Sequence, residues 1–415
     1  MTSVDDSRAQ RLLRWQAGET PGPWEVQLFF TNRCNLQCGI CWQRWAEKEF
    51  GGLDYSDELP DERWLELVDE GAVLGAREWI LVGGGEPMAR AELVLKLAER
   101  IRGYSAFCTM NTNGTMFKPK HIERLVQIGF SEIVFSLDGP TPEINDAIRS
   151  PGAFEKTVEA IRRFTELKRR YKTDRPRIST RTVITRLNYS KLDEMIDLFH
   201  GLGCDGAMGL SALTVQGDQC KGFELEIVQL AEARVHIERA LARTKSMGIA
   251  NNFHALLEDG DKGFTASIAT SEIPARKGLF NARCFEPWLG ILIHPNGKVC
   301  PCCVGYDDNS DSVREKPLAD VWLGAHLQAL REQLAGNKAM KYCRICPGHL
   351  VERAACDRAE LNRLLSRETG ETATRVFSLP ARFAASVRAR GIRRTLRRGW
   401  EWTQIRVRNF RCPRP

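Results

Sequence analysis

The sequence lacks an apolar run of about 18 residues, the shortest length that indicates a membrane-spanning helix. Its first residues are polar and acidic, without the basic and apolar stretches that together direct export. Its seven histidines show no paired spacing of the kind found in histidine metal sites. From these absences we expect a cytoplasmic protein that does not cross a membrane.

Cysteine, by contrast, is abundant and clustered. Most of the fourteen cysteines lie in three groups, at residues 34–41, 284–303 and 343–346. A secreted disulfide scaffold is usually short and carries cysteines along its whole length. Clustering in a chain without an export signal therefore favours metal-binding thiolates in a reducing compartment.

The charge is distributed unevenly along the 415 residues. The net charge is +7, but residues 375–415 contain twelve arginines, no lysine and one acid. The rest of the chain is consequently mildly acidic. Any argument for an anionic partner applies to this tail alone.

Residues 24–222 alternate between β-rich segments and segments with helical spacing of apolar residues. Repeated strand–helix units with short connections favour a parallel sheet with helices outside. We therefore predict an α/β fold, a partial (β/α)6 TIM-like barrel. The expected strands are 24–31, 79–82, 106–110, 133–135, 178–184 and 207–213.

After this alternation, residues 223–247 form one long helical pattern. Pro295-Asn296-Gly297 then separates two apolar segments, and Asn-Gly is typical of a tight hairpin turn. One helix is expected at 319–334, and another is expected after Cys346, ending at about residue 367. The predicted divisions are an arm (1–23), a core barrel (24–222), a helical linker (223–283), a small cysteine-rich α+β domain (284–370) and a basic tail (371–415).

Three cysteines, Cys34, Cys38 and Cys41, follow the first predicted strand at spacings of four and three. Three thiolates on one loop can bind three irons of an iron–sulfur cube and leave the fourth iron open for chemistry. Taken alone, the three cysteines leave a zinc site open as the less favoured alternative.

Further motifs follow the next strands, where parallel barrels build their active sites. The second strand ends in Gly83-Gly84-Gly85-Glu86-Pro87 and the third in Asn111-Thr112-Asn113-Gly114. The fourth ends in Ser136-Leu137-Asp138-Gly139, and Arg149 follows. Glycines allow close backbone approach, and a carboxylate can accept hydrogen bonds from an amine.

Together, these motifs resemble the radical S-adenosylmethionine (SAM) superfamily. The resemblance implies that Cys34, Cys38 and Cys41 are catalytic ligands of a 4Fe–4S cluster whose open iron binds SAM. It also implies that SAM is cleaved to a 5′-deoxyadenosyl radical, which removes hydrogen from an unactivated C–H of the substrate. One departure is Ile40, where the family commonly has an aromatic residue. The residues that the resemblance assigns to SAM are Gly84, Gly85, Glu86, Pro87, Asn113, Ser136, Asp138 and Arg149.

The second cysteine-rich region resembles the SPASM/Twitch extension of these enzymes. That resemblance implies a second, auxiliary 4Fe–4S cluster on Cys284, Cys302, Cys343 and Cys346. Cys303 competes with Cys302, because adjacent strand residues point to opposite faces. A second auxiliary cluster that uses Cys300 and Cys356 stays open, as does a zinc ribbon. Cys220 is a weaker candidate for a hydrogen-atom donor.

The expected function is net oxidation or rearrangement of a substrate in cofactor, natural-product, carbohydrate or lipid biosynthesis. Epimerisation or cross-linking by a peptide or protein maturase is the alternative, which the short segment before Cys34 makes less favoured. The expected partners are a small-molecule or peptide substrate and a flavodoxin- or ferredoxin-type electron donor. The arginine-rich tail leaves membrane-surface contact open. The competing class is a zinc protein that binds nucleic acid, and the motifs favour the enzyme.

Overall fold

The structure is a computed structural model that describes most of the chain between residues 6 and 369. The described residues are 6–41, 43, 56–213, 220–257, 279–303, 305, 309–336, 338–340, 343 and 348–369. They divide into two compact units, residues 1–354 and 355–415. The sheet and both predicted cysteine sites, as far as they are described, belong to the first unit.

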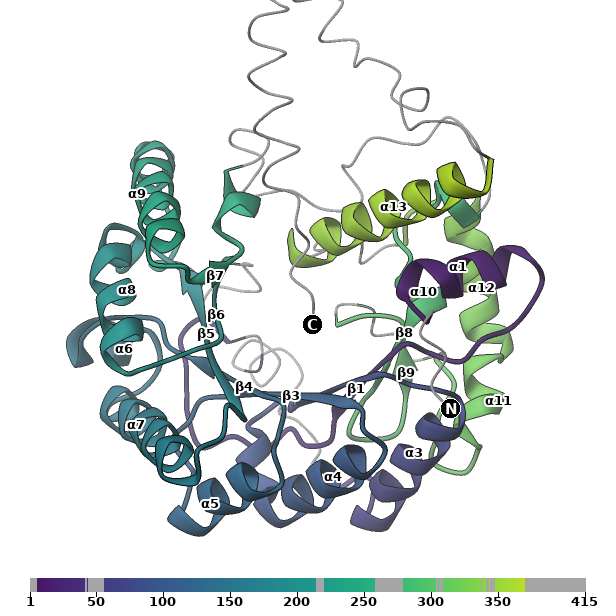
Figure 1. The fold of residues 1–415 in the computed structure, drawn as a ribbon, viewed down its shortest axis with the longest axis horizontal. Coiled ribbons are helices and arrows are strands. Elements are labelled where there is room, and N and C mark those ends of the chain that lie inside the picture. The colour runs from purple at the N-terminus through teal and green to yellow at the C-terminus, as the bar shows by residue number, and fades with distance from the viewer. Residues whose placement is uncertain are drawn as a thin grey trace, which may run out of the picture. The chain divides into compact units, whose positions relative to one another are not determined.

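The six predicted strands are present as neighbouring parallel strands, which confirms the α/β class (Figure 1). Each strand pairs with the next in sequence order. The strands are β1 (Glu25–Phe29), β2 (Glu78–Val82), β3 (Phe107–Thr112), β4 (Glu132–Ser136), β5 (Arg177–Ile184) and β6 (Ala207–Ala212).

Helices cover the outer side of this curved sheet (Figure 1). Their apolar faces, which include Trp64, Leu97 and Phe164, pack on outward-facing strand residues such as Leu28 and Leu81 in one continuous core. The helices between the strands are α3 (Asp61–Val73), α4 (Ala91–Gly103), α5 (Pro119–Gln127), α6 (Pro142–Ile148), α7 (Ala153–Tyr171) and α8 (Leu192–Gly201). The helix α6 had no counterpart in the prediction.

The predicted hairpin is present and continues the same sheet. Strand β8 (Gly290–Ile293) pairs in parallel with β1 and antiparallel with β9 (Val299–Cys300). The turn between β8 and β9 requires Gly297, whose φ is +85°. At the opposite edge, β7 (Ala250–Asn251) pairs with β6 after the long helix α9 (Ile227–Ser246). The described residues thus form one nine-stranded sheet. The division into domains stays a prediction.

Two local features differ from what the sequence indicated. The N-terminal segment, for which no helix was predicted, contains helix α1 (Arg8–Gln16), which packs beside the short helix α10 (Glu286–Leu289). The single helix expected at 319–334 is two helices, α11 (Leu318–Trp322) and α12 (Ala325–Ala335). They break at Gly324, where a Cβ atom would lie 2.8 Å from a carboxylate oxygen of Asp311.

Helix α13 (Gly348–Thr369) agrees with the last predicted helix. No helix in the described ranges is long and apolar enough to cross a membrane.

A buried charge network lies at the N-terminal end of β1 and β2. Glu25 is buried and receives two hydrogen bonds, of 3.1 and 3.0 Å, from Nη1 of Arg353. Glu78 stands directly opposite Glu25 in the β1–β2 register. Burial, and then the neighbouring Glu25 charge, raise the pKa of Glu78 above its ordinary value of 4.5.

We predict that Glu78→Gln stabilises the protein in a pH-dependent way. Because the folded state binds the Glu78 proton more tightly than the unfolded chain, the ionised carboxyl lowers stability once the pH rises above 4.5. The glutamine variant should unfold at the same urea concentration as the parent near pH 4. It should exceed the parent by about 0.5 to 1 kcal/mol at pH 8. Glu62→Gln, on the exposed face of α3, is the matched control. An equal difference at both pH values would contradict this account.

Candidate active site

The cysteine loop begins just beyond β1 and is clamped first by the end of β2. The N–H of Gly85 donates to the carbonyl of Thr31 (3.0 Å), and the N–H of Glu86 donates to the carbonyl of Arg33 (2.8 Å). A Cβ atom on Gly85 would collide with the backbone of Arg33. Position 85 therefore has to be glycine for the predicted Gly-Gly-Glu-Pro motif to reach the loop.

Glu86 joins the end of β2 to the end of β3. Its buried carboxylate accepts hydrogen bonds from the N–H of Met88 (3.0 Å), the hydroxyl of Thr112 (2.6 Å) and the N–H of Asn113 (2.7 Å). Burial raises the pKa of Glu86, and these hydrogen bonds oppose the shift. A carboxylate offers about four acceptor positions, so one position is left for a ligand amine.

The third strand holds the loop through Asn113, whose predicted contact with SAM stays a prediction. The Nδ2 of Asn113 donates to Oδ1 of Asn35 (3.1 Å) and lies 4.0 Å from Sγ of Cys34. The side chain of Asn35 in turn donates to the hydroxyl of Thr115 (2.8 Å). The motif analysis missed Asn35 and Thr115. The available signal was their position in the sequence, since Asn35 follows Cys34 and Thr115 lies two residues after Asn113.

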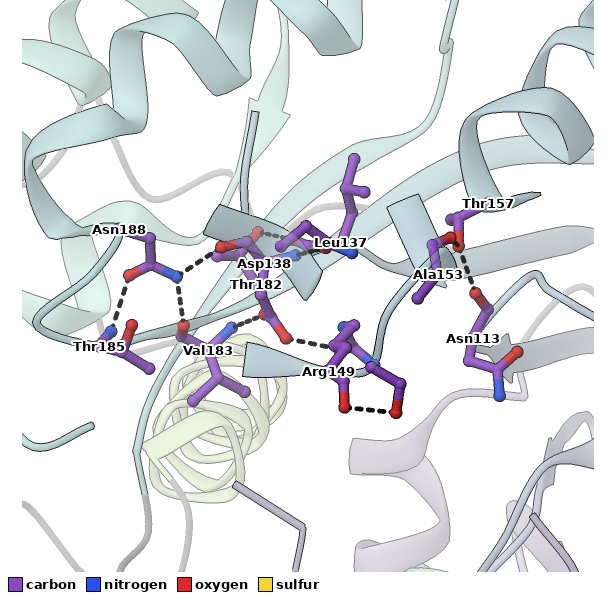
Figure 2. Close-up of polar contacts among 12 residues, drawn as sticks. Asn113, Leu137, Asp138, Arg149, Ala153, Thr157, Thr182, Val183, Thr185 and Asn188 are labelled. Atoms are coloured by element: carbon purple, nitrogen blue, oxygen red, sulfur yellow. Dashed lines mark hydrogen bonds and ion pairs between the residues drawn. The ribbon is translucent and has the colours of Figure 1, made fainter. Parts of the chain in front are cut away.

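The fourth strand contributes Asp138, which is fully buried at the turn after β4. Its Oδ1 accepts from the N–H of Val183 (2.7 Å), and Oδ2 lies 2.7 Å from Nη2 of Arg149 (Figure 2). Asn188 donates to the carbonyls of both Asp138 (2.9 Å) and Val183 (2.8 Å), which ties the ends of β4 and β5 together (Figure 2). Asn188 is another residue that the motif analysis missed.

Arg149 is enclosed beside the cysteine loop. Burial alone would lower the pKa of Arg149, but Asp138 and then the Cys38 thiol outweigh it and hold it above the ordinary value. Its Nε is buried and has no hydrogen-bond partner among the described residues. The guanidinium therefore stays charged and keeps one donor for a bound anion.

The three thiols of the loop suit an iron–sulfur cluster by their donor chemistry. All three are partly exposed, and Cys34 and Cys41 both act on the charge of Cys38. Burial is the largest of the effects that raise the pKa of Cys38 to about 11. Across the described part of the chain, no three His, Cys, Asp or Glu side chains stand at metal-ligand distances. The assignment of the ligands therefore stays a prediction.

Gly84 and Ser136 lie at the ends of their strands, as predicted, and Pro87 begins the short helix η1 (Pro87–Arg90). Phe223 closes the loop from the side that follows β6, because a Cβ atom on Gly39 would lie 2.6 Å from its ring. The predicted SAM residues thus gather around one loop at the C-terminal edge of the sheet.

The second cysteine group lies at the opposite, N-terminal edge. Cys284 precedes β8, and Cys302 follows β9, which runs back along β8. The Sγ of Cys284 accepts from the N–H of Glu286 (3.4 Å). Cys343 is also buried, whereas Cys346 lies outside the described residues.

The rival ligands differ in their surroundings. Cys300 donates through its sulfur to the carbonyl of Cys302 (3.1 Å) and lies 3.2 Å from Nε2 of His294, so it is engaged within the hairpin. Cys303 is partly exposed, and burial raises its pKa to about 11. The choice between Cys302 and Cys303 stays open. Cys220 is buried and lies where the described chain resumes after β6.

Helix α1 braces this second region. Arg8 pairs with Glu286 (3.1 Å), and Nε1 of Trp15 donates to the carbonyl of Trp288 (3.0 Å). The guanidinium of Arg331 lies between the rings of Trp15 (4.7 Å) and Trp322 (4.5 Å). The segment before β8 is consequently fixed by residues that are distant in sequence, and sequence spacing gave no signal for them.

Comparison with known families matches both regions. The model of the radical SAM superfamily matches residues 28–199. A model described as an iron–sulfur cluster-binding domain, SPASM, matches residues 284–347. The first match covers the cysteines at 34–41 and the strand-end motifs, and the second covers the cysteines at 284–303 and 343–346.

Curated relatives match most of the chain. Pre-heme d1 synthase from Dinoroseobacter shibae is 28% identical and covers 81% of this chain and 83% of its own. PqqA peptide cyclase from Granulibacter bethesdensis is 26% identical, and the match covers 79% of this chain and 80% of the cyclase.

Solved structures share the fold. SuiB from Streptococcus suis bound to S-adenosylmethionine has a TM-score of 0.57 and 16% identity, and covers 77% of this chain and 70% of SuiB. SuiB bound to its precursor peptide SuiA has a TM-score of 0.58 and 18% identity. This match covers 80% of this chain and 74% of SuiB.

Proposed function

The chain belongs to the radical SAM superfamily and carries a SPASM-type iron–sulfur domain, and on that premise we propose that it oxidises an unactivated C–H position of a small-molecule precursor. The enzyme uses a SAM-binding 4Fe–4S cluster, SAM and an auxiliary cluster. The observation that carries the proposal is the placement of the two cysteine groups. They lie at opposite ends of the paired parallel strands β1 and β8.

This placement leaves the inner side of the sheet between the two groups. A five-residue strand such as β1 spans about 16 Å, enough for a small molecule or one peptide residue to lie between the two ends. Clusters held by Cys34, Cys38 and Cys41 and by the predicted auxiliary cysteines would supply the one-electron chemistry that SAM cleavage and substrate oxidation require.

The chain's own residues would bind and orient SAM. Glu86 keeps one acceptor position for the SAM amine, and Gly85 allows the backbone to approach closely. Arg149 retains a buried donor for the SAM carboxylate or ribose, and Ser136 is proposed to bind the same part of SAM. Holding SAM in one geometry is what places the reacting carbon next to the substrate.

A small molecule is the favoured substrate because the relative named pre-heme d1 synthase covers most of the chain. Peptide modification is the second candidate, favoured by the similarly long match to PqqA peptide cyclase. The two differ in the source of the hydrogen that reaches 5′-deoxyadenosine.

Deuterium transfer tests this proposal. The reconstituted enzyme would be given a cell extract from cultures grown in heavy water, with and without prior peptidase digestion. Deuterated 5′-deoxyadenosine from both extracts supports a small-molecule substrate. If digestion removes the deuterium, the substrate is a peptide and the small-molecule proposal fails.

We propose a flavodoxin- or ferredoxin-type protein as the electron donor, because SAM cleavage requires a strong one-electron reductant.

For the basic tail, we propose contact with an anionic membrane surface, since its twelve arginines are interspersed with the apolar residues Phe383, Ile392, Leu396 and Trp400. The full chain should float with anionic liposomes, and a chain ending at Gly370 should not. Equal flotation would refute membrane contact by the tail.

A further inference from the structure

The segment that follows α6 runs directly beside the cysteine loop. The N–H of Gly39 donates to the carbonyl of Ile148 (3.0 Å), and the N–H of Gln37 donates to the hydroxyl of Ser150 (2.8 Å). These two bonds bracket one residue on each side, Cys38 on the loop and Arg149 on the segment. Cys38 and Arg149 therefore lie opposite each other between one backbone–backbone hydrogen bond and one hydrogen bond from the backbone to the Ser150 side chain.

The position of the Arg149 charge is fixed by a rigid surround. Its backbone N–H donates to the carbonyl of Asn145 (2.9 Å), and only 11% of its side chain is exposed. Its guanidinium lies 2.7 Å from Asp138, whose backbone N–H donates to the side chain of Asn145 (2.9 Å). Figure 2 shows Arg149 and Asp138 pointing toward each other from the turns that follow α6 and β4.

A fixed charge of this kind acts on any redox centre that Cys38 binds. Reduction adds one negative charge, so a buried cation beside the ligand favours the reduced state and a buried anion disfavours it. Both charges are shielded from solvent, where screening by salt is weak. Arg149 is the nearer to Cys38, because its segment is bonded to the loop on both sides.

We propose that Arg149, held in place by Asp138, is a positioning residue that raises the reduction potential of the cluster on the cysteine loop. Ser150 and the carbonyl of Ile148 keep Cys38 against it. The inference rests on the proposed function, because it requires that Cys38 binds a cluster. It goes beyond SAM binding by Arg149, since the effect is present without SAM.

Potentiometric titration of the full chain without SAM, followed by electron paramagnetic resonance, tests this inference. The relevant signal is the one whose shape changes when SAM is added to a parallel sample. At the midpoint potential of the parent, Arg149→Met should lower the ratio of reduced to oxidised cluster about tenfold, which is about 59 mV for one electron. Arg149→Lys should recover most of this loss, because it restores the charge.

Asp138→Asn should shift the potential in the opposite direction, because it removes the anion and keeps the cation. Arg162→Met, on the exposed face of α7, is the matched control and should shift nothing. Ser150→Ala removes the hydroxyl that accepts from Gln37, so it should loosen the loop and broaden the resonance signal. Ser150→Thr keeps a hydroxyl and should give the line width of the parent.

Two results would overturn the inference. One is an unchanged potential in Arg149→Met with the parent's iron content. The other result applies if Arg149→Met loses its cluster. The reduction potential of Asp138→Asn is then the test, and a potential equal to or lower than that of the parent refutes the proposal. A parent protein that binds no cluster would instead contradict the proposed function.

Discussion

Cys38→Ala removes SAM cleavage. The variant is expected to hold about four irons instead of about eight, because the auxiliary cluster keeps its own ligands. Release of 5′-deoxyadenosine with dithionite and SAM should fall about 1000-fold or more, since the cofactor carries the difficult chemistry. The site around it should stay folded, because the backbone bonds that bracket Cys38 do not use its thiol. Iron content and nucleoside release are the measurements.

Cys204→Ala is the matched control for Cys38→Ala. Burial raises the pKa of Cys204 to about 12, so it stays a protonated thiol that packs beside α8. The control should keep its iron and its activity. If Cys38→Ala retained both, Cys38 would not be a cluster ligand.

Glu86→Ala is expected to destabilise the protein strongly, through lost hydrogen bonds at the C-terminal edge of the sheet. The change leaves two backbone N–H groups, of Met88 and Asn113, and the hydroxyl of Thr112 without their buried acceptor. Each such loss costs roughly 1 to 3 kcal/mol, so the free energy of unfolding should fall by about 3 to 5 kcal/mol. Urea denaturation measures the loss.

The effect of Glu86→Ala should also reach the cysteine loop, because Glu86 and Asn113 both form hydrogen bonds to it. Glu92→Ala is the control. Glu92 lies on α4, where its exposed side chain pairs with Lys120, and its loss should leave the denaturation midpoint unchanged. A midpoint for Glu86→Ala equal to that of the control would show that Glu86 does not brace the site.

The sheet and the location of the site could be predicted because their signals are local. Ile133, Val134 and Phe135 form a β-rich run whatever surrounds them, and parallel strands place Glu86, Asn113 and Asp138 at one edge. The hairpin was predictable for the same reason, since Asn296-Gly297 specifies its own turn. The motif order then identified the family.

The contacts that fix the loop could not be predicted. Gln37 and Ser150 are 113 residues apart; Gln37 is a variable position inside the cysteine motif, and Ser150 belongs to none of the motifs. Helix α1 was missed because its stability comes from Trp15 and Arg8 packing on the segment around Trp288, which no local pattern reveals. The pairing of β8 with β1 was missed because the predicted domains had been treated as separate.

The central claim is that one chain binds two iron–sulfur clusters and that one of them binds SAM. Electron paramagnetic resonance of the anaerobically reconstituted, dithionite-reduced protein tests it most directly. We predict brown protein with about eight irons, and a cluster signal that changes when SAM is added and is missing in Cys38→Ala. Colourless, zinc-loaded protein without a SAM-sensitive signal would contradict the claim.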